Sequence, residues 1–205
     1  ILLAFPNTYF ADLNPKGKFD NLESVTKEVK LMMDPNADPF AAPAPDADAA
    51  PTKFGASDVQ DLNWVQLLNA YTCTECGRCT SACPANITGK KLSPRKIMMD
   101  TRDRMEEVGK NMDANKGVFV PDNKTLLNDY ITPEELWACT SCNACVEECP
   151  VNISPLSIIM DMRRYLVMEQ SAAPMSLNAM MTNVENNGAP WQYSQQDRLN
   201  WKNEN

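Results

Sequence analysis

The sequence predicts a mainly α-helical fold, on three observations. Seven glycines among 205 residues are few for a β-rich chain with many turns. Twelve methionines, together with many Glu, Lys and Leu residues, favour helix. Apolar residues recur at helical spacing in several segments, whereas the alternation typical of strands is weak throughout. With 43% hydrophobic residues, the chain can bury a core of ordinary size.

Residues 1–56 are predicted to form an extended arm, one short helix and a linker. The helix is expected over Leu22–Met33, where apolar residues recur at helical spacing until Asp34 and Pro35. Residues 38–51 are mostly Ala, Pro and Asp with little to bury, which predicts an extended linker. The opening run Ile1–Phe5 is apolar. It fits a buried strand, a clipped terminus or the end of a membrane helix.

Residues 57–172 are predicted to form the folded domain, and residues 173–205 a last helix and a connector. Each expected helix follows a capping signal or ends at one. The expected helices run from Ser57 through residues 63–70 to Cys73, from Ser93-Pro94 to about Gly109, from Thr132-Pro133 to Cys139, from Ser154-Pro155 to about Gln170, and from Ser176 to Asn187 before Gly188. Residues 110–130 are polar and are expected to be irregular.

The eight cysteines form two copies of one motif, C-x2-C-x2-C-x3-C-P, and none is left over. The first copy is Cys73, Cys76, Cys79, Cys83 and Pro84, and the second is Cys139, Cys142, Cys145, Cys149 and Pro150. A similar stretch of sequence follows each copy and leads to a Ser-Pro pair at which a helix is expected to begin. This pair comes five residues closer to the motif in the second copy. This duplication predicts two cluster-binding loops related by a pseudo-two-fold axis.

The spacing predicts two 4Fe-4S clusters. Three cysteines at two-residue gaps can wrap three corners of a cubane, and in two-cluster ferredoxins the fourth cysteine binds the other cluster. We therefore expect two crossed ligand sets: Cys73, Cys76, Cys79 and Cys149 for cluster 1, and Cys139, Cys142, Cys145 and Cys83 for cluster 2. Two structural zinc sites or a disulfide framework are the alternatives. Neither alternative requires a third cysteine at the same gap, or a proline after the fourth cysteine, in both copies of the motif.

Composition excludes several other functions. The chain has no histidine, which removes histidine acid–base catalysis, haem ligation by histidine and Cys/His zinc sites. The formal charge of −8 argues against a nucleic-acid partner. No run of about 18 apolar residues is present and no signal peptide is visible, so we expect the chain itself not to span a bilayer.

Other residues near the motifs carry weaker signals, each with a functional and a structural interpretation. Arg78 could raise a cluster potential or be a solvated loop charge. Lys90, Lys91, Arg95 and Lys96 could dock an acidic partner or an anionic membrane, or form a solvated face. Trp64 and Trp137 could shield a cluster, but a core position is the simpler interpretation. The methionines Met98, Met99, Met160 and Met162 are expected to pack in the core.

The motifs, joined by a long insert, resemble the α-helical ferredoxin domain over about residues 57–170. This domain occurs in heterodisulfide reductase C-type subunits, anaerobic glycerol-3-phosphate dehydrogenase C-type subunits and the succinate dehydrogenase iron–sulfur subunit. Residues 186–193 (NNGAPWQY) and 196–201 (QDRLNW) resemble the N-P-W-G…D-R…W connector of heterodisulfide-reductase-related oxidoreductases, from which Ala189 and Gln192 depart.

Residues 5–9 and 23–30 resemble family members that begin with a nitrate-reductase-gamma-like membrane domain. The resemblance implies a juxtamembrane arm over residues 1–56, a preceding membrane helix and a following cysteine-rich CCG domain. The chain would then be a fragment of a longer protein.

These patterns predict an electron-transfer module of a membrane-associated oxidoreductase. Expected partners are a membrane-embedded quinone- or haem-binding protein or domain, other redox subunits and a CCG-type domain. We expect a peripheral position on the cytoplasmic face of the inner membrane. The alternative is the iron–sulfur subunit of a heterodisulfide-reductase-like or glycerol-3-phosphate-dehydrogenase-like enzyme. No complete catalytic site is visible in the sequence, so catalysis would lie in a partner or another domain.

Overall fold

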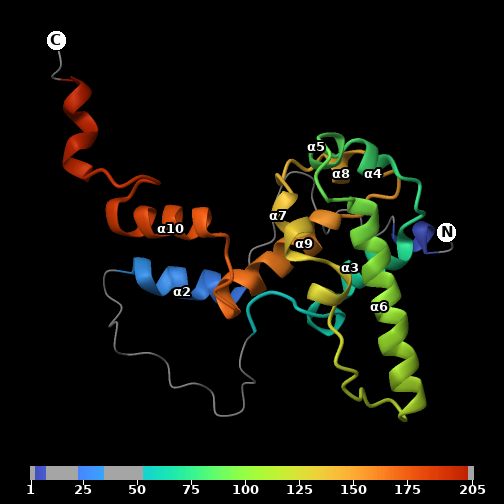
Figure 1. The fold of residues 1–205 in the computed structure, drawn as a ribbon. Helices are drawn as coiled ribbons and strands as arrows, with labels where there is room; N and C mark the ends of the chain where they lie inside the picture. Colours follow the sequence, from blue (N-terminus) through green and yellow to red (C-terminus); the bar gives the residue numbers. More distant parts are fainter. Residues whose placement is uncertain (1–2, 8–22, 35–52, 203–205) are drawn as a thin grey trace. The chain divides into compact units, whose positions relative to one another are not determined.

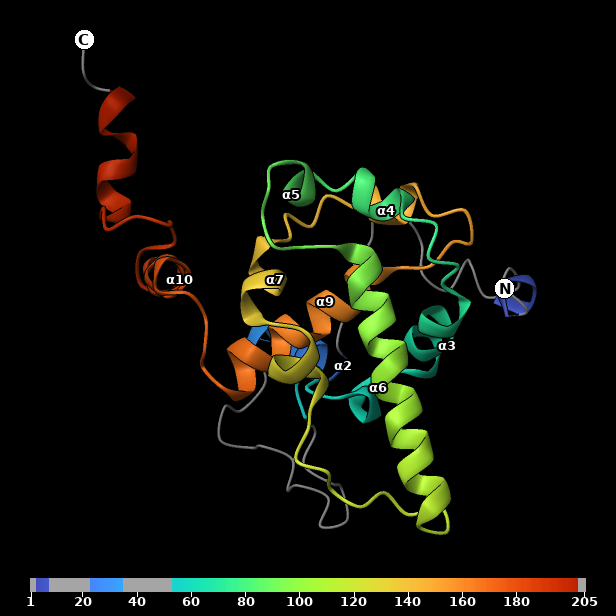
Figure 2. The same ribbon diagram turned by 45° about the vertical axis from the view of Figure 1, so that its right-hand side comes forward.

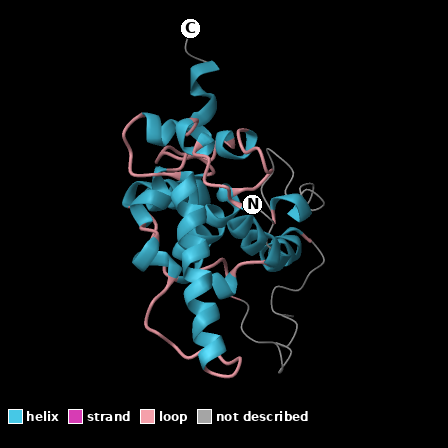
Figure 3. Cartoon of the chain, turned by 90° about the vertical axis from the view of Figure 1, so that its right-hand side faces the viewer, coloured by secondary structure: helices cyan, strands magenta, loops and turns pink. Residues whose placement is uncertain are grey.

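A computed structural model describes residues 3–7, 23–34 and 53–202. These residues form helices and loops without a β-strand (Figure 3), which confirms the prediction of a mainly α fold. The chain divides into two compact units, residues 1–169 and residues 170–205. Each unit is described by itself.

Two helices are described before residue 53. They are α1 (Ala4–Asn7) and α2 (Glu23–Met33), and α2 ends at the predicted residue. The predicted linker over residues 38–51 and most of the N-terminal arm lie outside the described residues. Within the described ranges, no helix has the length and apolar character needed to cross a membrane.

Three helices build the core of the first unit. They are α3 (Trp64–Thr72), α6 (Pro94–Ala114) and α9 (Pro155–Arg164), and α6 packs against both of the others (Figure 2). Met98 and Met162 are fully buried on these helices, as predicted, and Met99 and Met160 are half-buried. Burying each such side chain contributes about 1.5–3 kcal/mol.

The sequence duplication is visible in the packing. α3 and α7 (Pro133–Ala138) precede the two cysteine motifs, α4 (Arg78–Ser81) and α8 (Ala144–Glu147) lie within them, and α6 and α9 follow them. α4 packs on α8 and α6 on α9, while α3 contacts α6 as α7 contacts α9. Figure 1 shows α4, α8 and α5 (Pro84–Ile87) together at one end of α6. This arrangement agrees with the predicted pseudo-two-fold symmetry.

Local capping starts three helices where the sequence predicted. The Ser93 hydroxyl accepts a hydrogen bond from the Lys96 amide at the start of α6, and the Ser154 hydroxyl accepts one from the Ser157 amide at the start of α9. Thr132 begins α7 with a reciprocal capping box. Each cap satisfies an amide that the helix itself leaves free.

The predicted cap at Ser57 is wrong. The side chain of Asn63 caps α3 and accepts a hydrogen bond from the Gln66 amide at 2.9 Å, while Gln66 bonds back to the Asn63 amide. Ser57 instead binds Lys53 and Asp61, ahead of a short 3₁₀ turn, η2 (Val59–Asp61). Its hydroxyl is therefore already engaged before α3 begins.

The predicted end of α6 near Gly109 is also wrong, because the helix continues to Ala114. Val108 is buried beside this glycine, so packing outweighs the helix-propensity cost of about 1 kcal/mol. In the last turn of α6, the side-chain amide of Asn111 binds both the carbonyl and the amide of Val120 at 2.9 Å, and this holds the chain that returns after the helix. Of residues 110–130, which were predicted to be irregular, 110–114 belong to α6, 115–125 are irregular and the rest form a turn, η3 (Leu126–Tyr130).

The segment before η2 is held against α9. The amide of Ala56 donates to the carbonyl of Asp161 at 3.0 Å. Gly55 has φ +80°, and a Cβ placed on it would lie 2.2 Å from the same carbonyl oxygen. Only glycine fits this approach without movement of the backbone. α9 itself widens into a π-type turn, η4 (Tyr165–Glu169).

The second unit contains α10 (Met175–Asn187) and a 3₁₀ segment, η5 (Gln195–Lys202). α10 begins one residue before the predicted start and ends at Gly188 in the left-handed conformation, as predicted. The Arg198 guanidinium donates to the Gly188 carbonyl and so connects η5 to the end of α10.

Candidate metal centre

The two cysteine loops share one backbone conformation. Glu75 and Ser141, each two residues after the first cysteine of its loop, have φ of 57° and 56°. Gly77 and Asn143 are also left-handed and immediately precede α4 and α8. These left-handed residues turn each loop sharply, which brings cysteines that are three residues apart to one side of it.

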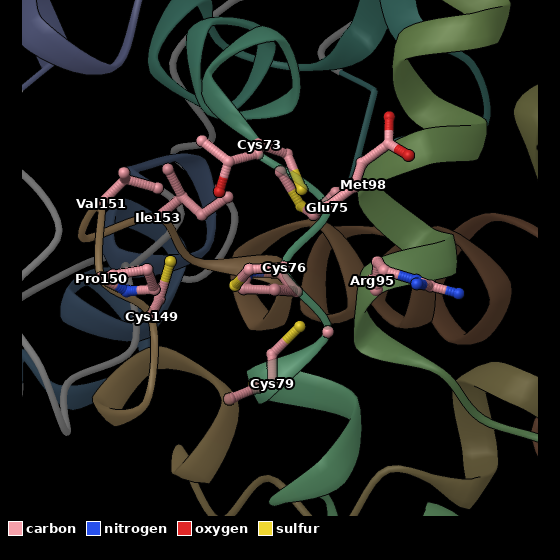
Figure 4. Close-up of a pocket in the computed structure, with 14 residues that line it drawn as sticks. Cys73, Glu75, Cys76, Cys79, Arg95, Met98, Cys149, Pro150, Val151 and Ile153 are labelled. Carbon is pink, nitrogen blue, oxygen red and sulfur yellow. The ribbon is translucent and has the colours of Figure 1, made fainter. Parts of the chain in front are cut away.

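Five cysteines line the first pocket, namely the four of the first predicted ligand set and Cys145 of the second. Cys73, Cys76 and Cys79 line it from the first loop, and Cys149 lines it from the second (Figure 4). Met98 of α6 and the apolar residues Val151 and Ile153 complete much of its wall. The four residues of the first predicted ligand set therefore lie together, and the fourth comes from the other repeat.

The pKa values of two thiols, Cys139 and Cys145, indicate that the cysteines of the second predicted ligand set are neighbours. Burial raises the pKa of Cys139, and the neighbouring thiols of Cys83 and Cys142 raise it further. Burial also raises the pKa of Cys145 to about 12, with contributions from Cys139, Cys79, Cys142 and Cys83. Cys83 thus lies close to the cysteines of the second loop, as the crossed assignment expects.

These thiols suit a positively charged iron centre. Burial raises the pKa of Cys73 and Cys79 as well, so the thiolates that ligate iron are disfavoured without a compensating charge. Iron supplies that charge, and metal binding thereby couples to folding. The residues present fit two 4Fe-4S clusters.

Backbone amides reach the sulfur atoms in both loops. The Ser141 amide donates to the Cys139 sulfur at 3.4 Å. In the first loop, a hydrogen bond from the Glu75 amide opposes the effect of burial on the pKa of Cys73. Such bonds stabilise thiolate and are among the features that set cluster potentials.

The predicted basic patch is divided by ion pairs. Lys96 binds Asp100 at 2.7 Å and Glu135 at 2.9 Å, so it joins α6 to α7. Lys91 pairs with Glu134 at 3.4 Å. Arg95 is exposed and lines the first pocket, and Arg78 is exposed at the start of α4, which fits its interpretation as a solvated charge. The solvated-face interpretation therefore fits the exposed residues Lys90, Lys91 and Arg95 of the patch, whereas Lys96 is structural.

The two tryptophans differ. Trp64 is 56% exposed, so the core position predicted for it is wrong; it opens α3 on the face that looks away from the core. Trp137 is half-buried and packs against the core, and the Arg163 guanidinium lies 5.0 Å from its ring centroid.

Sequence reasoning missed two arginines that contact the cysteine loops. Arg102 on α6 pairs with Glu75 at 2.7 Å, and Arg163 on α9 donates to the Cys139 carbonyl at 2.5 Å. The duplication carries the signal that could have found them, because each arginine lies two residues after the aspartate of its repeat, Asp100 or Asp161.

Comparison with known proteins supports this description of the site. Residues 72–153 match the family described as "4Fe-4S dicluster domain". The chain is 34% identical over 186 residues to "Probable iron-sulfur-binding oxidoreductase FadF" of Bacillus subtilis, covering 77% of this chain and 26% of the relative. It is 34% identical over 169 residues to "EtfAB:quinone oxidoreductase" of Syntrophomonas wolfei, covering 74% and 24%.

A third relative is "Probable membrane-anchored ferredoxin" of Chromohalobacter salexigens, 35% identical over 171 residues, with 76% and 25% covered. Subunits C and D of heterodisulfide reductases from Methanosarcina species also match. The chain spans about a quarter of the length of the first three relatives.

The fold and the cysteine loops define an iron–sulfur protein with a dicluster domain that holds two 4Fe-4S clusters. The chain is related to the iron–sulfur oxidoreductases of the heterodisulfide-reductase type. Both conclusions agree with the expectations from the sequence.

Proposed function

We propose that this chain transfers electrons between two 4Fe-4S clusters with crossed ligands. Cys73, Cys76, Cys79 and Cys149 hold the first cluster, and Cys139, Cys142, Cys145 and Cys83 hold the second. Each cluster, when bound, takes up and releases one electron at a time. The protein supplies the thiolates, the amide hydrogen bonds and the apolar walls that set the potentials.

The proximity of the two cysteine sets carries this proposal. Cys145 of the second set also lines the first pocket, and Cys79 packs with Cys145 in one small apolar cluster. Each set in addition has one exposed cysteine, Cys76 or Cys142. Electrons can therefore pass between adjoining sites and reach a partner at the exposed edge of either.

An EPR-monitored dithionite titration of the reconstituted chain tests the proposal. We expect two S = 1/2 signals that broaden or split one another when both clusters are reduced, because the sites adjoin. A protein with its full iron content that gives no signal on reduction would contradict electron transfer.

We further propose that the chain works in a membrane-associated oxidoreductase linked to quinone or haem, on the cytoplasmic face. The names of two relatives, a quinone oxidoreductase and a membrane-anchored ferredoxin, support this. A membrane-embedded quinone- or haem-binding protein or domain, other redox subunits and a CCG-type domain would be its partners. The clusters of the native complex should then be reduced by a quinol in anaerobic membranes.

The match to heterodisulfide reductase subunits supports one alternative, an iron–sulfur subunit of a thiol–disulfide enzyme. An experiment on the native complex distinguishes the quinone- or haem-linked function from this alternative. Reoxidation of the complex's dithionite-reduced clusters by a heterodisulfide, with no response to quinone, would favour the alternative.

A further inference from the structure

The two repeats place one arginine each against their own cysteine loop. Residues 97–102 read IMMDTR on α6, and residues 158–163 read IIMDMR on α9. The final residues, Arg102 and Arg163, are thus equivalent, and each contacts the loop that precedes its helix. The two arginines differ in whether a carboxylate lies in contact with them, and this difference matters for a charged cofactor.

Arg163 is half-buried and donates to uncharged oxygen atoms. Its Nε and Nη2 bind the Leu136 carbonyl at 3.0 and 2.6 Å, and Nη2 also binds the Cys139 carbonyl at 2.5 Å. Its Nη1 lies 3.4 Å from the Ser141 hydroxyl. Among the described residues, no carboxylate forms an ion pair with it. In the part of the chain that the structure describes, its positive charge therefore has no carboxylate in contact beside the second loop.

Arg102 has a carboxylate partner in the same place. Its Nη1 lies 2.7 Å from Glu75 Oε1, and its Nε is 3.6 Å from Asp103. Glu75 occupies the loop position equivalent to Ser141, with nearly the same φ. The two loops therefore share a backbone conformation and an arginine, and the side chain that faces the arginine is glutamate in the first loop and serine in the second. The first loop also carries Arg78 where the second has Ala144, and the second carries Glu147 and Glu148 where the first has Ser81 and Ala82.

We infer that Arg163 raises the reduction potential of the second cluster, and that Glu75 cancels the equivalent effect of Arg102 on the first. Reduction adds one electron from an external donor to a cluster and its thiolates, which become more negative by one charge. A nearby uncompensated cation favours that product, and its effect is larger at a half-buried site than in water. The exchange of glutamate for serine thus makes the two clusters inequivalent.

Other charges near the loops contribute less. Arg78 and Arg95 near the first pocket, and Glu147 and Glu148 in the second loop, are exposed. Water and salt screen exposed charges strongly when they act over a distance. Glu75 is exposed as well, but it acts at contact distance, since its carboxylate lies 2.7 Å from the Arg102 guanidinium. The inference rests on the proposed two-cluster function and on the crossed ligand sets.

The test exchanges the charge of the side chain that faces each arginine. In Ser141→Glu, the new carboxylate would pair with Arg163. The ratio of reduced to oxidised second cluster at a fixed potential should fall about tenfold, equivalent to about 59 mV for a one-electron couple. In Glu75→Gln, the first cluster should shift in the opposite direction by a similar factor. The two variants should affect different EPR signals.

Ser141→Gln is the matched control, because it has the size of the glutamate without its charge. For this variant we expect the ratio of reduced to oxidised cluster at a fixed potential to stay within about twofold of wild type for both clusters. Equal shifts in Ser141→Glu and Ser141→Gln would overturn the inference, because size alone would then explain them. If both variants fail to bind iron, Glu75→Gln decides, and an unshifted first cluster overturns the inference. A wild-type protein without two reducible clusters would instead contradict the proposed function.

Discussion

At the level of single residues, Arg104 is a fully buried charge that joins three segments of the domain. Its side chain is fully buried on α6 and binds Asp58 at 2.8 Å and Asp122 at 2.5 Å. It also donates to the Lys124 carbonyl at 2.7 Å. The hydrogen bond from this guanidinium holds the pKa of Asp122 down to about 2. One side chain thereby joins η2, α6 and the loop after α6.

Replacing Arg104 by Met should destabilise the domain by about 3 kcal/mol, because two carboxylates lose their common partner. For a chain of this size, the midpoint of thermal unfolding of the cluster-loaded protein should fall by roughly 6–12 °C. Circular dichroism measures this midpoint. Lys124→Gln is the control, because it removes only an exposed ion pair with Glu107 and should change little. Equal midpoints for both variants would show that Arg104 is not a structural centre.

At the level of elements, the contact between the Gly55 segment and α9 makes the sharpest prediction. Gly55→Ala adds a methyl group that meets the Asp161 carbonyl and the Tyr165 amide at 2.2 and 2.5 Å. Gly89 has a similar φ of +77°, but open space surrounds its missing Cβ. Gly89→Ala therefore isolates the backbone strain, about 1–2 kcal/mol.

We expect Gly55→Ala to lose roughly 2 kcal/mol more than Gly89→Ala, because overpacking adds to the same strain. Thermal unfolding of the two variants, measured side by side with full cluster content, checks this difference. Similar losses in the two variants would mean that the Gly55 segment does not dock closely on α9.

The sequence predicted elements where the signal is local and failed where packing decides. Three helices begin where predicted because their start depends on four consecutive residues only. In each, a hydroxyl accepts a hydrogen bond from the amide three residues later, and a proline occupies the first helical position; the capping residues are Ser93, Thr132 and Ser154. The end of α6 depends on buried Val108 and on Asn111 binding Val120, which no local pattern shows. Arg163 was missed because its acceptors are backbone carbonyls 24 and 27 residues away.

At the level of the whole molecule, the crossed ligands would tie the two repeats together. Cys149 lines the first pocket with the cysteines of the first loop, and Cys83 acts electrostatically on Cys139 and Cys145 of the second. Removal of iron by a chelator should therefore unfold most of residues 57–169 and abolish most of the helical circular dichroism signal. A metal-free protein that keeps its helical signal and its thermal transition would show that the helices fold without the clusters.

The cysteine pattern predicted the dicluster domain and its cofactors from spacing, because three cysteines at two-residue gaps can reach three corners of a cubane. The asymmetry between the loops could not be predicted in the same way. It depends on which side chain lies opposite each arginine, and this requires the folded positions of Glu75 and Ser141.

The most direct test of the crossed clusters compares three single substitutions by EPR of the dithionite-reduced protein. Cys76→Ala removes a ligand that only the first loop supplies, and Cys142→Ala removes one that only the second loop supplies. The crossed arrangement predicts that Cys149→Ala loses the signal lost in Cys76→Ala and keeps the signal lost in Cys142→Ala. A Cys149→Ala spectrum that instead matches Cys142→Ala would contradict the crossed assignment and place each cluster within its own loop.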